Sequence, residues 1–227
     1  MAPAETARKA PTRTTPKRTR NPERTREDIL RVATTEFADK GLSGARIDEI
    51  AAKTATTKRM LYYYFGDKEG LYRAVLANAY QEIRHEEAQV DVDHLDPEAA
   101  IRAVAEITFD HHEAHPDFIR LVAIENTHRG ENLAAIEGIA ETQRPAVETL
   151  DRILARGREL GLFRDDVTPL DVHILISSFC VFRIANRYTF GTLFDWDLTA
   201  PENRTHLRTM LGDVVLSYLR SNTGHDD

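Results

Sequence analysis

The sequence predicts an all-α protein with a three-helix N-terminal domain of the helix-turn-helix type and a larger C-terminal helical bundle. Three observations carry this prediction. Apolar residues recur every three or four positions along most of the chain, as helices require. No alternation of apolar and polar residues is long enough for a strand. Proline and glycine separate the periodic stretches from one another.

The N-terminal segment differs from the rest in charge and composition. Eight basic and two acidic residues give residues 1–26 a net charge of +6, which leaves −13 for the remainder of a chain whose total is −7. Residues 1–20 contain almost no large apolar side chain, so they cannot offset the entropy cost of ordering. We expect a disordered basic arm over 1–20, which either contacts nucleic acid or only adds solubility.

The first helices follow this arm. Ile29, Val32, Ala33 and Phe37 predict a helix that ends at Gly41. Ile47, Ile50 and Ala51 predict a helix of about two turns, residues 54–57 a turn and cap, and residues 58–65 a second short helix. Asp67 is placed to cap a longer helix. A tight turn between two short helices is the helix-turn-helix arrangement, which we assign to residues 21–66.

The remaining chain predicts helices only. Apolar faces run through 101–109, 118–122, 147–154, 175–182 and 207–218, and each is bounded by a helix-breaking pair. These breaks are His115-Pro116, Arg129-Gly130, Leu160-Gly161, Thr168-Pro169 and Ala200-Pro201. We therefore expect one helical domain over 67–222, whose role is considered below, and a disordered tail over 223–227.

The stretch 58–69 carries the most specific chemistry. Two cations open a short helix, three consecutive tyrosines follow, and a lysine begins the next helix. Leu61 and Phe65 lie four residues apart and share one helical face, so the cations, Tyr62 and Tyr63 point elsewhere. A tyrosine ring can pack on sugars or a thymine methyl while its hydroxyl bonds a phosphate. The alternative is that the tyrosines only cover the core of the small domain.

Residues 24–71 resemble the DNA-binding domain of the TetR family of repressors. The resemblance rests on the first helix from Ile29 to Phe37 with Gly41, on Ile47-Asp48-Glu49-Ile50-Ala51, and on Leu61-Tyr62-Tyr63-Tyr64-Phe65 with Lys68-Glu69. It implies that Thr57 caps the recognition helix and bonds a phosphate. It also implies base-edge contacts for Lys58, Arg59 and Met60, DNA contacts for Tyr62 and Tyr63, and backbone contacts for Tyr64 and Lys68.

Three positions depart from the family pattern. Ala55 replaces the usual glycine of the turn, which costs about 1 kcal/mol if its φ is positive. Thr56 replaces a valine, and Arg46 replaces a threonine at the start of the second helix, where it could contact a phosphate as a cation. The C-terminal half is similar to one subgroup of the family through residues 115–121 and 185–190, and in the family this half dimerises and encloses an effector.

A ligand pocket is predicted where polar residues continue apolar helical faces. Glu125 follows Phe118 and Leu121 on one face, and Arg183 follows Phe179 and Phe182 on another. An unpaired buried charge is costly, so these residues need partners. The hypothesis is a pocket with four polar groups and four aromatic walls: Glu125, His128, Arg183 and Asn186 with Phe109, Phe118, Phe179 and Phe182. The alternative is an internal Glu125–Arg183 ion pair without a ligand.

Other classes of site are not expected. His111, His112 and His115 lack the zincin spacing, so no metal site is predicted, although His111 and His115 share a helical face. Cys180, the only cysteine, is expected to be a buried apolar residue. Catalytic motifs and cofactor-binding motifs are absent. No apolar run is long enough for a bilayer span or a secretory signal, so we expect a cytoplasmic protein without a membrane partner.

The expected function is that of a homodimer that binds a palindromic double-stranded DNA operator and is released by a small-molecule effector. Two alternatives stay open. An activator or architectural DNA-binding protein would share every N-terminal feature and would bind DNA more tightly with effector, or without any effector. A helical enzyme would consume its ligand and would tolerate loss of Tyr62 or Lys68.

Overall fold

The protein is all-α, as predicted. The structure is a computed structural model that describes residues 22–220, so the arm and the tail expected at 1–20 and 223–227 lie outside the described residues. The first four helices are α1 (Pro22–Gly44), α2 (Ile47–Lys53), α3 (Lys58–Phe65) and α4 (Lys68–Glu87). The others are α5 (Pro97–Ala114), α6 (Pro116–Thr127), α7 (Glu131–Ala134), α8 (Arg144–Glu159), α9 (Pro169–Ala185), α10 (Arg187–Phe194) and α11 (Pro201–Leu219), with a 3₁₀ turn, η1 (Glu141–Gln143), before α8.

Local chemistry explains where the helices begin and end. Thr57 and Asp67 accept hydrogen bonds from the first turns of α3 and α4, and Thr168 forms a capping box with Asp171 at α9. Proline occupies the first turn of α5, α6, α8, α9 and α11, where its missing N–H costs nothing. Gly41 has a φ of 67° inside α1, so the regular helix ends at the predicted residue and a further turn follows.

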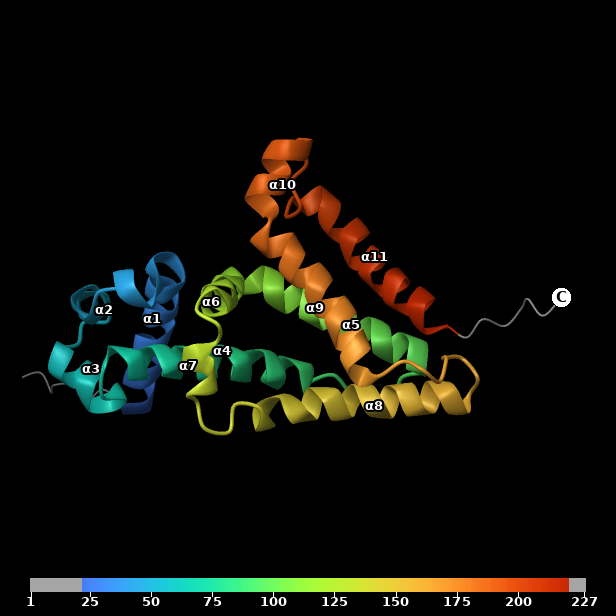
Figure 1. Cartoon of the computed structure of the whole chain (residues 1–227), viewed down its shortest axis with the longest axis horizontal. Coiled ribbons are helices and arrows are strands. Elements are labelled where there is room, and N and C mark those ends of the chain that lie inside the picture. The colour runs from blue at the N-terminus through green and yellow to red at the C-terminus, as the bar shows by residue number, and fades with distance from the viewer. Residues whose placement is uncertain (1–21, 221–227) are drawn as a thin grey trace, which may run out of the picture.

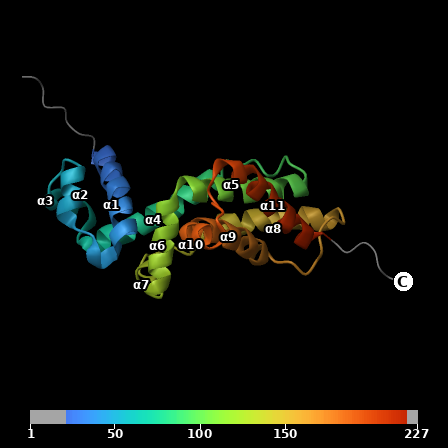
Figure 2. The same cartoon turned by 90° about the horizontal axis from the view of Figure 1, so that it is seen from above.

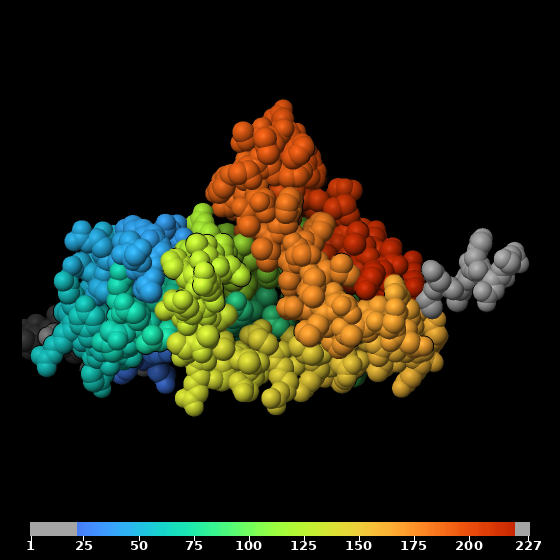
Figure 3. All heavy atoms as spheres, in the orientation of Figure 1, coloured from blue at the N-terminus to red at the C-terminus, as the bar shows by residue number. Residues whose placement is uncertain are grey.

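The helices form a long molecule with two ends of different character. Helices α1 to α3 gather at one end of the long axis, while α5, α8, α9 and α11 pack together at the other (Figure 1). The view from above places α3 at the outer limit of its end (Figure 2). Helix α10 rises above the body as an apex (Figure 3). No described helix combines the length and the apolar character needed to cross a bilayer.

Helix α4 connects the two ends and belongs to both. Leu71, Tyr72, Val75 and Leu76 from its first half are buried with α1, α2 and α3 in one apolar cluster. Its second half contacts α5 and α8. Helix α6 also reaches the first cluster through Leu121. The expected domains 21–66 and 67–222 therefore share one apolar cluster, because α4 and α6 pack on α1, α2 and α3.

The short elements α7, η1 and α10 were not predicted separately. A short helix leaves few residues in which a period can be recognised; α2 and α3 were predicted because a capped turn joins them, whereas α7, η1 and α10 have no side-chain cap. Helix α7 follows Gly130 in the left-handed region, with a φ of 70°. Glu125 holds α7 in place, since its buried carboxylate accepts hydrogen bonds from Asn132 and from the backbone N–H of Leu133. These contacts between α6 and α7 do not follow from helical periodicity.

Candidate nucleic-acid interface and ligand cavity

Helix α3 has one buried face and one exposed face. Leu61 is buried and Phe65 is half-buried against the N-terminal cluster, in agreement with the spacing argument. The exposed face carries Thr57, Lys58, Arg59, Met60, Tyr62 and Tyr63. Thr57 caps the helix by accepting a hydrogen bond from the backbone N–H of Met60 at 3.3 Å. The chain therefore presents cations and tyrosines together on an accessible helix.

The three tyrosines are not equivalent. The exposed fractions of Tyr62 and Tyr63 are 46% and 79%, so these rings do not serve the core of the described chain. Tyr64 is half-buried, and its ring lies edge-on to Tyr63 with 5.5 Å between ring centroids. We infer that Tyr62 and Tyr63 are available to a partner, while Tyr64 also supports the helix.

The cations around α3 divide into accessible and paired groups. Arg46 and Arg59 are exposed. Lys58 Nζ lies 2.5 Å from a carboxylate oxygen of Asp48 on α2, and both side chains are half exposed, so a competing anion can displace this weak pair. Lys68 Nζ donates to the carbonyl oxygen of Ser43 at 3.2 Å, which ties the start of α4 to the end of α1.

A buried carboxylate fixes α2 against α1. Glu36 is buried and accepts hydrogen bonds from Lys40 at 2.7 Å and from Lys53 at 3.0 Å. Burial alone would raise the pKa of Glu36, but the hydrogen bonds from the two lysines outweigh it and lower the pKa to about 2. The carboxylate stays ionised at neutral pH and keeps its ion pairs with Lys40 of α1 and Lys53 of α2. These pairs hold α2 on α1 next to the turn that leads to α3.

The turn between α2 and α3 contains the strain expected from the sequence. Ala55 has a φ of 49°, a left-handed conformation that disfavours residues with a Cβ. The usual glycine of the family would adopt it without this penalty. The chain holds the conformation because neighbouring backbone groups close the turn, with the N–H of Thr56 donating to the carbonyl of Ala51 at 3.1 Å.

Replacing Ala55 by glycine is expected to raise the free energy of unfolding by about 1 kcal/mol, because it relieves the left-handed strain. Urea unfolding followed by circular dichroism measures the change. Ala52→Gly is the matched control. Ala52 is an exposed residue of the neighbouring regular helix, so the same substitution there should lower the free energy of unfolding by about 0.5 to 1 kcal/mol. Equal signs for the two variants would contradict the strain at Ala55.

The eight residues of the predicted ligand pocket do not come together. Phe118 packs with Ala79, Ile119 and Ile184 in a small separate cluster. His128 caps the end of α6 through the carbonyl of Ile124, and Glu125 holds α7. On α9, Phe182 is about half exposed, while Asn186 caps the helix end. Phe109, which lies under Arg183, and Phe179 belong to the large C-terminal cluster.

The alternative pairing of Arg183 with Glu125 is also wrong. The buried guanidinium of Arg183 binds Glu113 of α5 at 2.8 Å and the carbonyl oxygen of Leu198 at 3.2 Å. It lies over the ring of Phe109, with 3.9 Å between Cζ and the ring centroid. The sequence identified the need for a partner but not the partner, because periodicity does not say which helices cross.

A different cavity lies between α4, α5, α8 and α9. Its volume is about 60 Å³. The polar lining residues are Arg84, Glu87, Thr108, Thr149 and His173, and the apolar ones are Ala88, Val104, Pro145, Ala146, Leu150 and Ile176. Sequence reasoning missed all of them. The only signal was a charged pair three residues apart at the end of the long helix, which is also typical of a solvated helix end.

The polar groups of this cavity are poorly satisfied. Arg84 Nη1 lies 2.8 Å from Glu87 Oε2, and both side chains are mostly buried. Neither Nη1 nor Nε of Arg84 has a well-aligned hydrogen bond within the described chain. Burial lowers the pKa of Arg84 and raises that of Glu87. Burial also lowers the pKa of His173, so its ring is neutral at pH 7. A buried donor without a partner, Nε of Arg84, beside apolar walls favours a small ligand with an acceptor group.

Large exposed apolar side chains form a second accessible surface. Apart from three residues on α3, those of the described chain all lie beyond residue 159. They include Leu170, Ile174 and Phe182 on α9, Tyr188, Leu193 and Phe194 on α10, and Val214 and Tyr218 on α11. Apolar side chains clustered on neighbouring helices indicate a surface for another protein chain.

Two family models match this chain. Residues 29–75 match the family described as bacterial regulatory proteins, tetR family, and residues 97–215 match the tetracyclin repressor-like C-terminal domain. The HTH-type transcriptional repressor NicS of Pseudomonas putida is 34% identical over 209 residues, which cover 92% of this chain and 99% of the relative. The HTH-type transcriptional repressor SCO4008 of Streptomyces coelicolor is 32% identical over 157 residues, 69% of this chain and 77% of the relative.

A solved structure extends the likeness to the fold. The putative transcriptional regulator SCO4942 of Streptomyces coelicolor superposes with a TM-score of 0.63 at 28% identity, covering 84% of this chain and 97% of that one. The matches run through both ends of the molecule and confirm the resemblance found in residues 24–71. The chain belongs to the TetR family of transcriptional regulators.

Proposed function

We propose that the protein is a repressor that binds a palindromic DNA operator as a homodimer and releases it when a small molecule enters the cavity between α4, α5, α8 and α9. The observation that carries the DNA-binding part is the exposed face of α3, where Arg59, Tyr62 and Tyr63 are accessible on a rigid support. The names of the two relatives, both repressors, favour repression over activation.

Dimerisation gives the proposed recognition helix, α3, its specificity for a DNA sequence. A single eight-residue helix contacts few bases, whereas two copies in successive major grooves read two half-sites. The exposed apolar side chains of α9, α10 and α11 are the proposed dimer surface, because a twofold axis pairs the same patch on both subunits. Light scattering of the purified protein tests this step, and Ile174→Glu on α9 should shift the mass from two chains to one.

The small size of the cavity suggests how a ligand would act. A cavity that holds a benzene molecule measures about 150 Å³, whereas this one measures about 60 Å³. A ligand of ordinary size must therefore push the four helices apart. The C-terminal end of α4 lines the cavity, and its N-terminal half packs against α3. A shift of α4 therefore moves α3. Ligand binding then favours a state with misplaced recognition helices.

The direct test measures DNA release. A duplex selected from a random pool by the purified full chain serves as the operator, and fluorescence anisotropy at fixed salt measures its affinity. A panel of small organic acids is screened by thermal shift, and any acid that raises the melting temperature is added to the complex. Release of the duplex by such a compound supports the proposal. A chain that selects no duplex at low ionic strength refutes DNA binding, and a chain that stays bound with every stabilising compound refutes induction.

Replacing Arg84 by methionine is expected to raise the concentration of the releasing compound needed for half-release by at least tenfold. Methionine keeps the length and apolar packing of the side chain but removes the unpartnered Nε donor and the ion pair with Glu87. Affinity for the operator without the compound should change little, because Arg84 lies near the C-terminal end of α4, whereas α3 packs on the first half of α4. Arg152→Ala, on the exposed side of α8, is the control and should leave both quantities unchanged. Equal sensitivity of both variants to the compound would place the effector elsewhere.

A further inference from the structure

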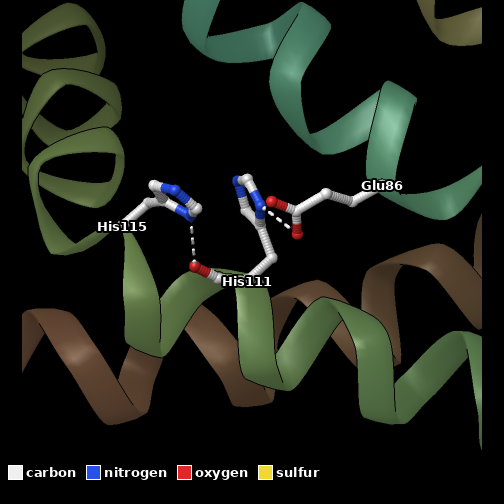
Figure 4. A group of neighbouring side chains, drawn as sticks. All are labelled: Glu86, His111 and His115. Carbon is white, nitrogen blue, oxygen red and sulfur yellow. Dashed lines mark hydrogen bonds and ion pairs between the residues drawn. The ribbon is translucent and has the colours of Figure 1, made fainter. Parts of the chain in front are cut away.

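Two histidines and a glutamate meet where α4 crosses the end of α5, apart from the α3 surface and the effector cavity. Figure 4 shows Glu86 of α4 facing His111 and His115, which lie one turn apart on α5 and its cap. His111 Nδ1 is 2.9 Å from Glu86 Oε2. One ligand-capable atom from each of the three residues lies within 4.8 Å of the others.

The orientation of each ring suits coordination. The Nδ1 atom of His115 is 3.1 Å from the carbonyl oxygen of His111, so Nδ1 carries the proton and Nε2 keeps a lone pair. The contact between Glu86 and His111 already joins a carboxylate to a ring nitrogen. Zinc bonds such ligands at about 2.0 to 2.2 Å, which places ligand atoms roughly 3.4 Å apart. Side-chain rotations that move each ligand atom by about 1 Å would bring the three atoms to that spacing.

The surroundings give a cation access and attract it. His115 also lines a cleft of about 600 Å³ between α1, α4 and the α5–α6 corner. The charged residues of that cleft are Glu27, Asp28, Arg31, Glu82 and Asp117, so carboxylates outnumber the cation four to one. Such a cleft raises the local concentration of cations. Glu82, which lies one turn before Glu86 on α4, lines the same cleft.

We propose that Glu86, His111 and His115 bind one divalent transition-metal ion of the zinc class, and that the ion fastens α4 to α5. Two imidazoles and one carboxylate form a donor set that zinc and its neighbours favour over magnesium or calcium. The sequence predicted no metal because Glu86 lies 25 residues before His111. Since α3 packs on the first half of α4, the ion would hold α3 more firmly relative to the C-terminal helices.

The test uses the full chain without a polyhistidine tag, freed of metal by a chelator and dialysed. Calorimetric titration with Zn²⁺ alone should give one ion per chain. Glu86→Gln and His115→Ala, both at half-buried positions, should each weaken binding at least tenfold, and the double variant should abolish it. His94→Ala is the control, because His94 is an exposed histidine with its own carboxylate partner, Asp91, at 3.1 Å.

A second measurement separates coordination from a folding defect. The metal-free variants should melt near the wild-type temperature, and Zn²⁺ should raise the melting temperature of the wild type and of His94→Ala but not of His115→Ala. Wild-type binding no tighter than that of the double variant overturns the proposal. So does an equal loss in His94→Ala. Neither result depends on DNA binding, so the metal site and the proposed repressor function fail or stand separately.

Discussion

The double variant Arg59→Ala/Tyr63→Ala is expected to bind the selected duplex at least 100-fold more weakly than the wild type. Both side chains are exposed on α3, so their removal leaves the apolar cluster around Leu61 intact. Arg59 can read a guanine through two hydrogen bonds, and each such contact contributes about 1 to 3 kcal/mol of discrimination. Tyr63 can pack on the sugar and donate its hydroxyl to a phosphate, which contributes to affinity but not to base choice.

The two single variants should therefore differ in kind. Arg59→Ala should lower affinity for the selected duplex more than for unrelated DNA, whereas Tyr63→Ala should weaken both by similar factors. Tyr63→Phe, which keeps the ring, should recover part of the loss. Anisotropy titrations at several salt concentrations measure these quantities, because phosphate contacts and base contacts respond differently to salt.

Arg152→Ala is the matched control for Arg59→Ala. Arg152 is a half-exposed arginine on α8, so its loss removes the same charge without touching α3. Helix α8 packs with the helices at the other end of the molecule from α3 (Figure 1). Its affinity for the duplex should stay within twofold of the wild type. If the double variant, with unchanged helix content, also bound within threefold of the wild type, α3 would not be the DNA-contacting helix.

The N-terminal half could be predicted from the sequence because its signals are local. Thr57 and Asp67 cap helices through hydrogen bonds three residues along the chain, and Leu61 with Phe65 selects the buried face by spacing alone. The family resemblance covered residues 24–71. At Ala55 it set a condition, a cost if φ is positive, and the φ of 49° meets that condition.

The sites of the C-terminal half depend on contacts between distant residues, and there prediction failed. The hypothesis of a Glu125–Arg183 pocket assumed that two polar residues on apolar faces meet each other. In the structure Arg183 meets Glu113, which lies 70 residues away. The cavity between α4, α5, α8 and α9 takes residues from all four helices, and Glu86 joins His111 from a separate helix. Helical periodicity identifies the inward face of each helix but leaves the crossing partner undetermined.

Replacing Arg183 by alanine is expected to lower the free energy of unfolding by about 3 to 5 kcal/mol. The side chain is only 2% exposed, so its removal leaves a void above Phe109 and deprives the carbonyl of Leu198 of its donor. Glu113 retains one partner, since Arg204 Nε donates to the same carboxylate at 3.0 Å. Urea unfolding at fixed protein concentration measures the loss, because a dimer's apparent stability depends on concentration.

Arg183→Met separates the two contributions to that loss. Methionine fills most of the space but cannot donate, and Glu113 is not left as an uncompensated buried charge because it keeps Arg204 as a partner and is partly exposed. We expect it to cost about 1 kcal/mol, which is the net value of the lost hydrogen bond to Leu198. Arg204→Ala, which removes the half-exposed partner of the same carboxylate, should cost less than about 1 kcal/mol. Equal losses in Arg183→Ala and Arg204→Ala would mean that the guanidinium of Arg183 does not hold α9 to α5. The cavity wall that α9 supplies through His173 and Ile176 would then have to be positioned by apolar packing alone.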